Sequence, residues 1–152
     1  MGFFLILIGA LFITNPNLFD NVVRFLSNFK ITQVGTTDIY VPAPENIGDY
    51  IDVYLAARQF SLVWGVFLIG MAGARFILGS HVRRKAENIG DIVFWLGATY
   101  LIQTFLVQTT QALPQTIDAT KWFEFWATII VLVGVSLIAR AIFLLVARAR
   151  NI

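Results

Sequence analysis

The stretch of residues 122–147, which reads WFEFWATIIVLVGVSLIARAIFLLVA, decides the fold class of this chain. Only Glu124 and Arg140 carry a charge within it. As an α-helix it would be about 39 Å long at about 1.5 Å per residue, which exceeds the roughly 30 Å hydrocarbon core of a bilayer. We therefore predict that this stretch crosses a membrane.

The composition of the whole chain is that of a membrane protein. Its 152 residues are 58% hydrophobic and 13% charged, with a mean hydropathy of +0.76. An average soluble domain is about half apolar and about a quarter charged. A soluble fold this small would leave much of its apolar surface in water, where it would aggregate, so we predict an integral protein of the cell membrane.

Three further apolar segments precede this stretch. Residues 53–78 and 89–109 are each long enough to cross the bilayer, whereas Gly2–Thr14 would form a helix of only about 20 Å. A cleaved signal peptide is the alternative for Gly2–Thr14, but the segment lacks a basic n-region and an A-x-A-like site. The sequence predicts an all-α integral membrane protein, a four-helix transmembrane bundle whose first span is short.

The region between the first two spans, residues 15–48, is predicted to form an extracytoplasmic cap. Within 18–29, apolar side chains recur at helical spacing with polar residues opposite them, which indicates an amphipathic helix. Beside a membrane span, such a helix lies in the interface or, alternatively, packs as an ordinary domain helix.

The second part of this cap is predicted to be a small β-hairpin. β-Branched residues at 31–34 and 38–41 flank a turn that contains Gly35, and Pro42 and Pro44 are expected to end the pairing. Because no long linker interrupts the chain, we expect residues 1–152 to form a single polytopic membrane domain.

The basic residues predict the orientation in the membrane. They cluster at 83–85 and again at Arg148 and Arg150, whereas residues 15–50 carry more acids than bases. Cytoplasmic loops of membrane proteins are enriched in Lys and Arg. With four spans, both the N-terminus and the C-terminus are then cytoplasmic, and residues 15–50 are extracytoplasmic.

Residues for catalysis or cofactor binding are sparse. The chain has no cysteine, and its single histidine, His81, lies in a basic segment. Thiolate chemistry is therefore excluded, and a Ser-His-Asp triad or a nucleotide-binding loop is not indicated. A net charge of +2 is too small and scattered for nucleic-acid binding. We predict no enzyme, no catalytic or metal site and no cofactor.

Three charged residues are candidates for an intramembrane ion pair. Arg75 and Arg140 each lie eight residues before a basic helix end, and Asp91 opens the third span at a similar depth. Because an unpaired charge in the bilayer is costly, we predict that Asp91 contacts Arg75 or Arg140. Such a pair fixes helix packing or, alternatively, takes part in conduction or gating.

Two spans carry faces suited to helix association. A stripe of small side chains on the second span should allow close approach of another helix. The third span has a polar side that would hold helices together by hydrogen bonds or, alternatively, line a pore. The small stripe is Ser61, Gly65, Ala72 and Gly79, and the polar face is Thr99, Gln103, Thr104 and Gln108.

These features favour a function through association in the bilayer. We expect a non-catalytic structural or accessory subunit of a membrane assembly, with membrane lipid and either other membrane subunits or further copies of the chain as partners. The alternative is a small oligomeric channel or transporter whose pathway is lined by the polar face of the third span. Burial of that face against protein would favour the structural subunit, and exposure of the face to a water-filled axis would favour the channel.

Overall fold

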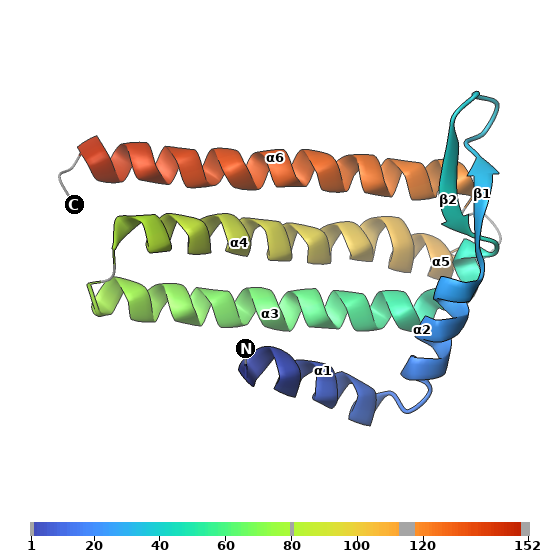
Figure 1. Cartoon of the computed structure of the whole chain (residues 1–152), viewed down its shortest axis with the longest axis horizontal. Helices are drawn as coiled ribbons and strands as arrows, with labels where there is room; N and C mark the ends of the chain where they lie inside the picture. Colours follow the sequence, from blue (N-terminus) through green and yellow to red (C-terminus); the bar gives the residue numbers. More distant parts are fainter. Residues whose placement is uncertain (1, 80, 113–117, 150–152) are drawn as a thin grey trace.

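The computed structural model describes residues 2–79, 81–112 and 118–149, which are mostly helical (Figure 1). Three helices are long and apolar enough to cross a membrane, where the sequence predicted four spans. The elements in chain order are α1 (Gly2–Thr14), α2 (Leu18–Ser27), β1 (Phe29–Gln33), β2 (Tyr40–Pro44), a 3-10 turn (Ile47–Tyr50), α3 (Ile51–Ile77), α4 (Val82–Leu101), a π-helical segment (Ile102–Gln108), α5 (Thr109–Ala112) and α6 (Ala119–Ala149).

The three long helices lie side by side, with α4 between α3 and α6 (Figure 1). The third predicted span begins earlier than expected, because α4 starts at Val82 and takes in the basic residues 83–85 as its first turn. The sequence pattern had placed these residues in a connecting loop. Helical structure continues beyond an apolar segment when the polar turns at its end extend outside the hydrocarbon layer.

The first helix, α1, covers only part of α3. The Phe3 ring stacks on Phe67 with centroids 4.0 Å apart, and Phe4 packs edge-on against Phe60. These contacts set the start of α1 beside the middle of α3, and α1 ends near the cap (Figure 1). Because α2 turns by 98° from α1, the two do not form one straight span.

The hairpin forms as expected in outline, but its strands include the two prolines that were predicted to end it. β1 and β2 pair antiparallel, with Pro42 opposite Ile31 and Pro44 opposite Phe29. Proline cannot donate to a ladder and is therefore confined to edge strands. In a two-stranded sheet both strands are edges, so each proline can turn its missing donor away from the partner.

The main buried cluster lies where the hairpin meets the ends of the long helices. The Phe25 ring of α2 packs against Tyr50 and Trp122, with ring centroids 5.2 and 6.2 Å apart. The Trp122 Nε1–H donates to the Pro42 carbonyl over 3.0 Å. The cluster joins the cap to α3, the π-helical segment and α6 through Ala43, Ile47, Tyr50, Tyr54, Leu101, Ile102, Leu106, Val107, Trp122 and Phe125.

A Trp122→Phe chain is expected to loosen the hairpin. The substitution removes the bond to Pro42 and part of a side chain that is only 3% exposed, at a cost of roughly 1 kcal/mol or more. Backbone amides of β2 should exchange with deuterium about fivefold faster, measured by mass spectrometry on the purified chain. Trp126→Phe is the control, because that ring is 49% exposed. Equal protection in both variants would contradict the role of Trp122.

Candidate functional site

Because α4 is the central helix, its faces form the candidate functional site. Toward α6 it presents Gly90 and Gly97, two turns apart. A Cβ at Gly90 would lie 3.2 Å from the Ser136 carbonyl oxygen, and one at Gly97 would overlap the Leu132 side chain. The two helices approach this closely only because both glycines lack side chains.

The opposite face of α4 packs against α3, where part of the predicted small stripe lies. Ser61 and Gly65 are buried, and a Cβ at Gly65 would come within 2.7 Å of Leu96 Cδ2 on α4. Ala72 is half-buried. Gly79 follows the end of α3 with a φ of +67° and no atom near its missing Cβ, so it serves a turn rather than a helix contact.

A buried amide links the same two helices. Asn88 of α4 is 1% exposed, and its Nδ2 donates to the Leu68 carbonyl of α3 over 2.9 Å. Polar bonds of this kind within membrane proteins contribute about 0.6–2 kcal/mol each. Asn88 does not stand out in the sequence, because a lone amide near the end of an apolar segment resembles a solvated residue.

The predicted polar face of the third span is divided between several environments. Gln103 accepts a hydrogen bond from Arg58 of α3, and both side chains are half-buried. Thr99 donates to the Trp95 carbonyl of its own helix. Thr104 is half-buried in the π-helical segment, and Gln108 is exposed. Within the described residues, the face therefore makes one hydrogen bond between spans, through Gln103.

The acid that pairs with Arg140 within 4.0 Å is Glu87 and not the predicted Asp91. Glu87 Oε1 accepts from Arg140 of α6 over 3.1 Å and from Arg83 of its own helix over 3.2 Å. Within the part of the chain that the structure describes, Asp91 is in no ion pair of 4.0 Å or less. Arg75 donates to the Arg84 carbonyl over 3.1 Å.

Glu87 was missed because depth in the membrane does not fix rotation around a helix. Glu87 and Asp91 are four residues apart, so they share one side of α4 and differ by about one turn in height. The signal for the α6-facing glycines was available in the sequence. Gly90 and Gly97 are seven residues apart, which is about two helical turns.

The uncovered sides of α4 expose polar groups. With α3 on one side and α6 on the other, two sides of α4 have no neighbouring long helix (Figure 1). Asp91 is exposed, and Tyr100 is 68% exposed. They are nine residues apart, which puts them on roughly opposite sides at about 100° per residue. Tyr100 also borders a groove of about 210 Å³ between α4 and α6.

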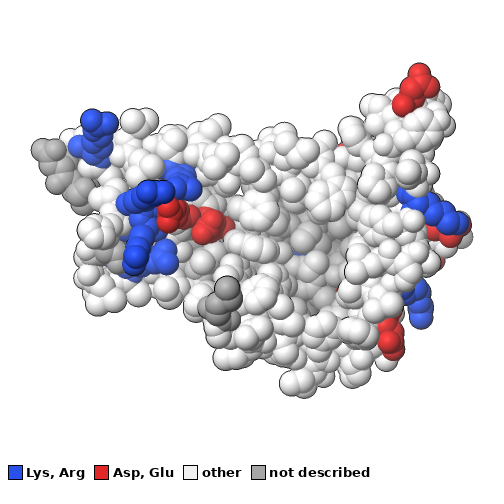
Figure 2. Space-filling view, viewed as in Figure 1, with Lys and Arg blue, Asp and Glu red and all other residues white. Residues whose placement is uncertain are grey.

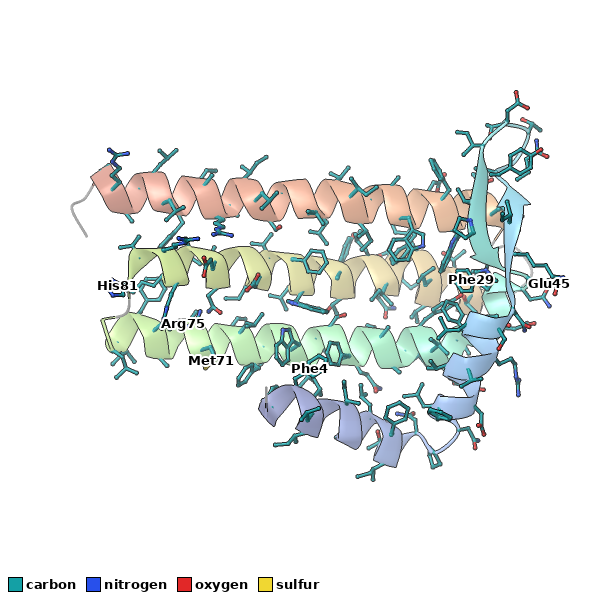
Figure 3. All side chains as sticks on the ribbon, in the orientation of Figure 1. Phe4, Phe29, Glu45, Met71, Arg75 and His81 are labelled. Carbon is teal, nitrogen blue, oxygen red and sulfur yellow. The ribbon has the colours of Figure 1, made fainter. Side chains whose placement is uncertain are left out.

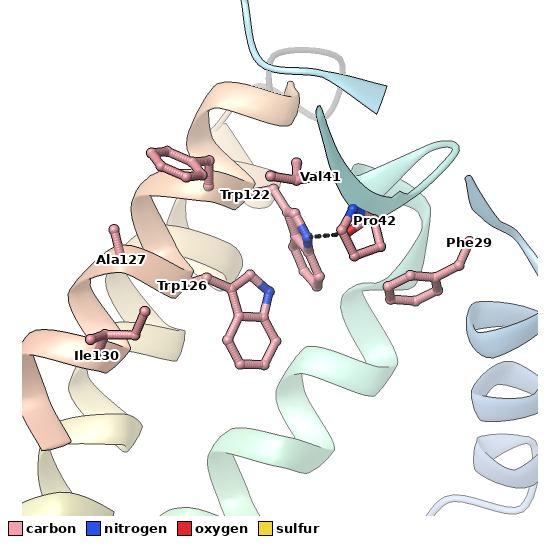
Figure 4. Close-up of a pocket in the computed structure, with 8 residues that line it drawn as sticks. Phe29, Val41, Pro42, Trp122, Trp126, Ala127 and Ile130 are labelled. Atoms are coloured by element: carbon pink, nitrogen blue, oxygen red, sulfur yellow. Dashed lines mark hydrogen bonds between the residues drawn. The ribbon is translucent and has the colours of Figure 1, made fainter. Parts of the chain in front are cut away.

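An apolar cleft lies between the hairpin and the start of α6 (Figure 4). Its volume is about 350 Å³. Phe29, Val41 and Pro42 form the hairpin side, and the α6 side comes from Trp122, Phe123, Trp126, Ala127 and Ile130. The lining contains no side chain that titrates near neutral pH, so the cleft is suited to apolar contact and not to proton transfer.

The described residues also offer no metal site, and the chain resembles no known protein in the comparisons. Among residues 2–79, 81–112 and 118–149, no group of three or more His, Cys, Asp or Glu side chains is placed to hold a metal ion. Comparison with protein-family models, curated proteins and solved structures finds no match to this chain.

Proposed function

We propose that the protein is a non-catalytic structural or accessory subunit of a membrane assembly. The observation that carries the proposal is that, within the described residues, long helices cover two sides of the central helix and leave two without such a neighbour. Its other two sides expose the carboxylate of Asp91 and the ring of Tyr100. Polar side chains in membrane spans face other helices because lipid tails cannot hydrogen-bond with them.

The outer helix of the layer supports the same proposal. In the most apolar stretch of α6, only 6% of the residues are buried inside this chain. The main long-helix contact of α6 is with α4, through the glycine face, and Phe143 also packs edge-on against Phe76 of α3. We propose that α1 completes a four-helix bundle only in part, and that neighbouring subunits or further copies of the chain occupy the remaining sides.

The proposed topology has the cap outside the cytoplasm and both termini inside, and it requires α1 to shift toward the basic end in the assembly, because its start now lies beside the middle of α3. The charges support it, since the end with the hairpin carries most of the acids and the opposite end carries residues 83–85. In α2, Leu18 is buried while Phe19 and Leu26 are each 63% exposed. An apolar stripe that is only partly covered by protein favours a helix lying in the membrane interface.

A channel or transporter is the weaker candidate. Its lining was expected to be the polar face of the third span, but Gln103 is engaged with Arg58 of the adjacent helix. Only Gln108 in that face is exposed. A pore would require several exposed polar side chains at successive depths along one line.

Photo-cross-linking in the source membrane tests the assembly proposal. A photoreactive phenylalanine at position 100 should give adducts with another protein, because this side of α4 is expected to be covered. The same group at Leu5 is the control, since that side chain is 66% exposed on a helix with no polar side chain until Thr14. We expect lipid adducts there. Only lipid adducts at position 100 would contradict the proposal.

A further inference from the structure

The end of the helical layer opposite the cap has a strong excess of positive charge. We name this the basic end, and its cations among the described residues are Arg75, Arg83, Arg84, Lys85, Arg140 and Arg148. Two acids, Glu87 and Asp91, lie among them, so six positive charges face two negative ones. Figure 2 shows the blue cluster around these red atoms, separated from the cap by a broad uncharged band.

Internal ion pairs leave much of this charge without a counter-charge. Glu87 is shared by Arg83 and Arg140. Within the described residues, no acidic side chain lies within 4.0 Å of a nitrogen of Arg75, Arg84 or Lys85. Two of the three side chains make other contacts: Arg75 donates to the Arg84 backbone carbonyl, and Lys85 Nζ lies 4.9 Å from the centroid of the Phe76 ring.

The cap end is built differently, which makes the contrast informative. Its described cations are Arg24, Lys30, Arg58 and Lys121, and they face seven acids. Lys30 pairs with Glu45 at 2.6 Å, and Lys121 pairs with Glu124 at 2.6 Å. The excess of positive charge is therefore confined to one end of the membrane-length helices.

From this charge distribution we propose that the basic end binds the headgroup of an anionic phospholipid, with Arg75, Arg84 and Lys85 as the contacting side chains. The phosphate would be complementary to these cations, which among the described residues have no acidic side chain within 4.0 Å. The position favours lipid over a soluble anion. Arg75 lies two residues before the end of α3, a helix of membrane length, and its side chain lies between α3 and α4 (Figure 3). Long basic side chains at such ends extend to the headgroup layer.

Native mass spectrometry of the purified full chain in detergent tests this proposal. Phosphatidylglycerol and phosphatidylcholine with identical acyl chains are added in equal amounts, and the bound ratio is measured. We expect the natural chain to prefer phosphatidylglycerol. An Arg75→Gln/Arg84→Gln/Lys85→Gln chain should lose at least tenfold of that preference, since each basic residue near an anionic surface contributes about fivefold.

Two further variants make the result specific. Arg24→Gln/Lys30→Gln/Lys121→Gln removes three positive charges at the cap end and should keep the preference. Arg75→Lys/Arg84→Lys keeps the charge and should also keep it, which separates lost binding from damaged folding. An unchanged preference in the triple variant of the basic end would overturn the proposal. So would displacement of the lipid by millimolar inorganic phosphate, because the site would then be one for a soluble anion.

Discussion

A Gly90→Leu/Gly97→Leu chain is expected to lose the packing of α6 against α4. Both glycines lie where the helices are too close for a side chain, and at Gly90 the opposing atom is a backbone carbonyl oxygen. Overpacking of this kind costs about 1–3 kcal/mol at each site. Because α4 is the main long-helix neighbour of α6, we expect α6 to separate from α4 along the glycine face, while Trp122 and Phe125 hold its start in the cluster at the cap.

The measurement is the free energy of unfolding in mild detergent, together with cysteine cross-linking between α4 and α6. Gly70→Leu and Gly134→Leu are matched controls, because a Cβ at either position would meet no atom within 4 Å. They should change the free energy of unfolding little. A double variant as stable as these controls, with its cross-link retained, would show that the α4–α6 interface is not the one described.

A Gln103→Leu chain is the second variant from which we expect a large effect. It leaves the Arg58 guanidinium, half-buried in a membrane-length helix, without its hydrogen-bond acceptor. Hydrogen bonds that involve a charged group contribute about 1.5–3 kcal/mol, so the free energy of unfolding should fall by about that amount. The Arg58→Leu/Gln103→Leu chain should recover part of the loss, because the unpaired charge is gone.

A double-mutant cycle in detergent measures this coupling. Gln108→Leu is the control, since that amide is exposed, and it should be close to neutral. A cycle in which the two substitutions are additive would remove the proposed link between Arg58 and Gln103. Ion flux through liposomes that disappears in Gln103→Leu while the fold is kept would instead favour the channel.

The positions of the long helices could be predicted from hydropathy, but their ends could not. Apolar runs report the hydrocarbon depth, and 89–109 therefore missed the turns of α4 that begin at Val82. The hairpin was predictable from β-branched residues around Gly35. Its inclusion of Pro42 and Pro44 was not, because the rule against strand prolines applies to central strands and this sheet has none.

The candidate site was harder to predict because packing depends on rotation and on neighbours. Helical spacing predicted a small stripe on the second span, and Ser61 and Gly65 do meet α4. A second close contact, at Gly90 and Gly97, is on the third span, for which the sequence had predicted polar contacts. The periodicity of a single helix shows which residues share a face. Which other helix packs against that face depends on the tertiary arrangement.

The central claim is that this chain works as part of a membrane assembly. Native mass spectrometry of the chain, extracted with a gentle detergent from its source membrane, tests that claim most directly. We predict a mass that corresponds to the chain with further copies of itself or with other membrane subunits. The Gly90→Leu/Gly97→Leu chain should be depleted from that species. A stable monomer with only lipid bound, and no other protein recovered with it, would contradict the account.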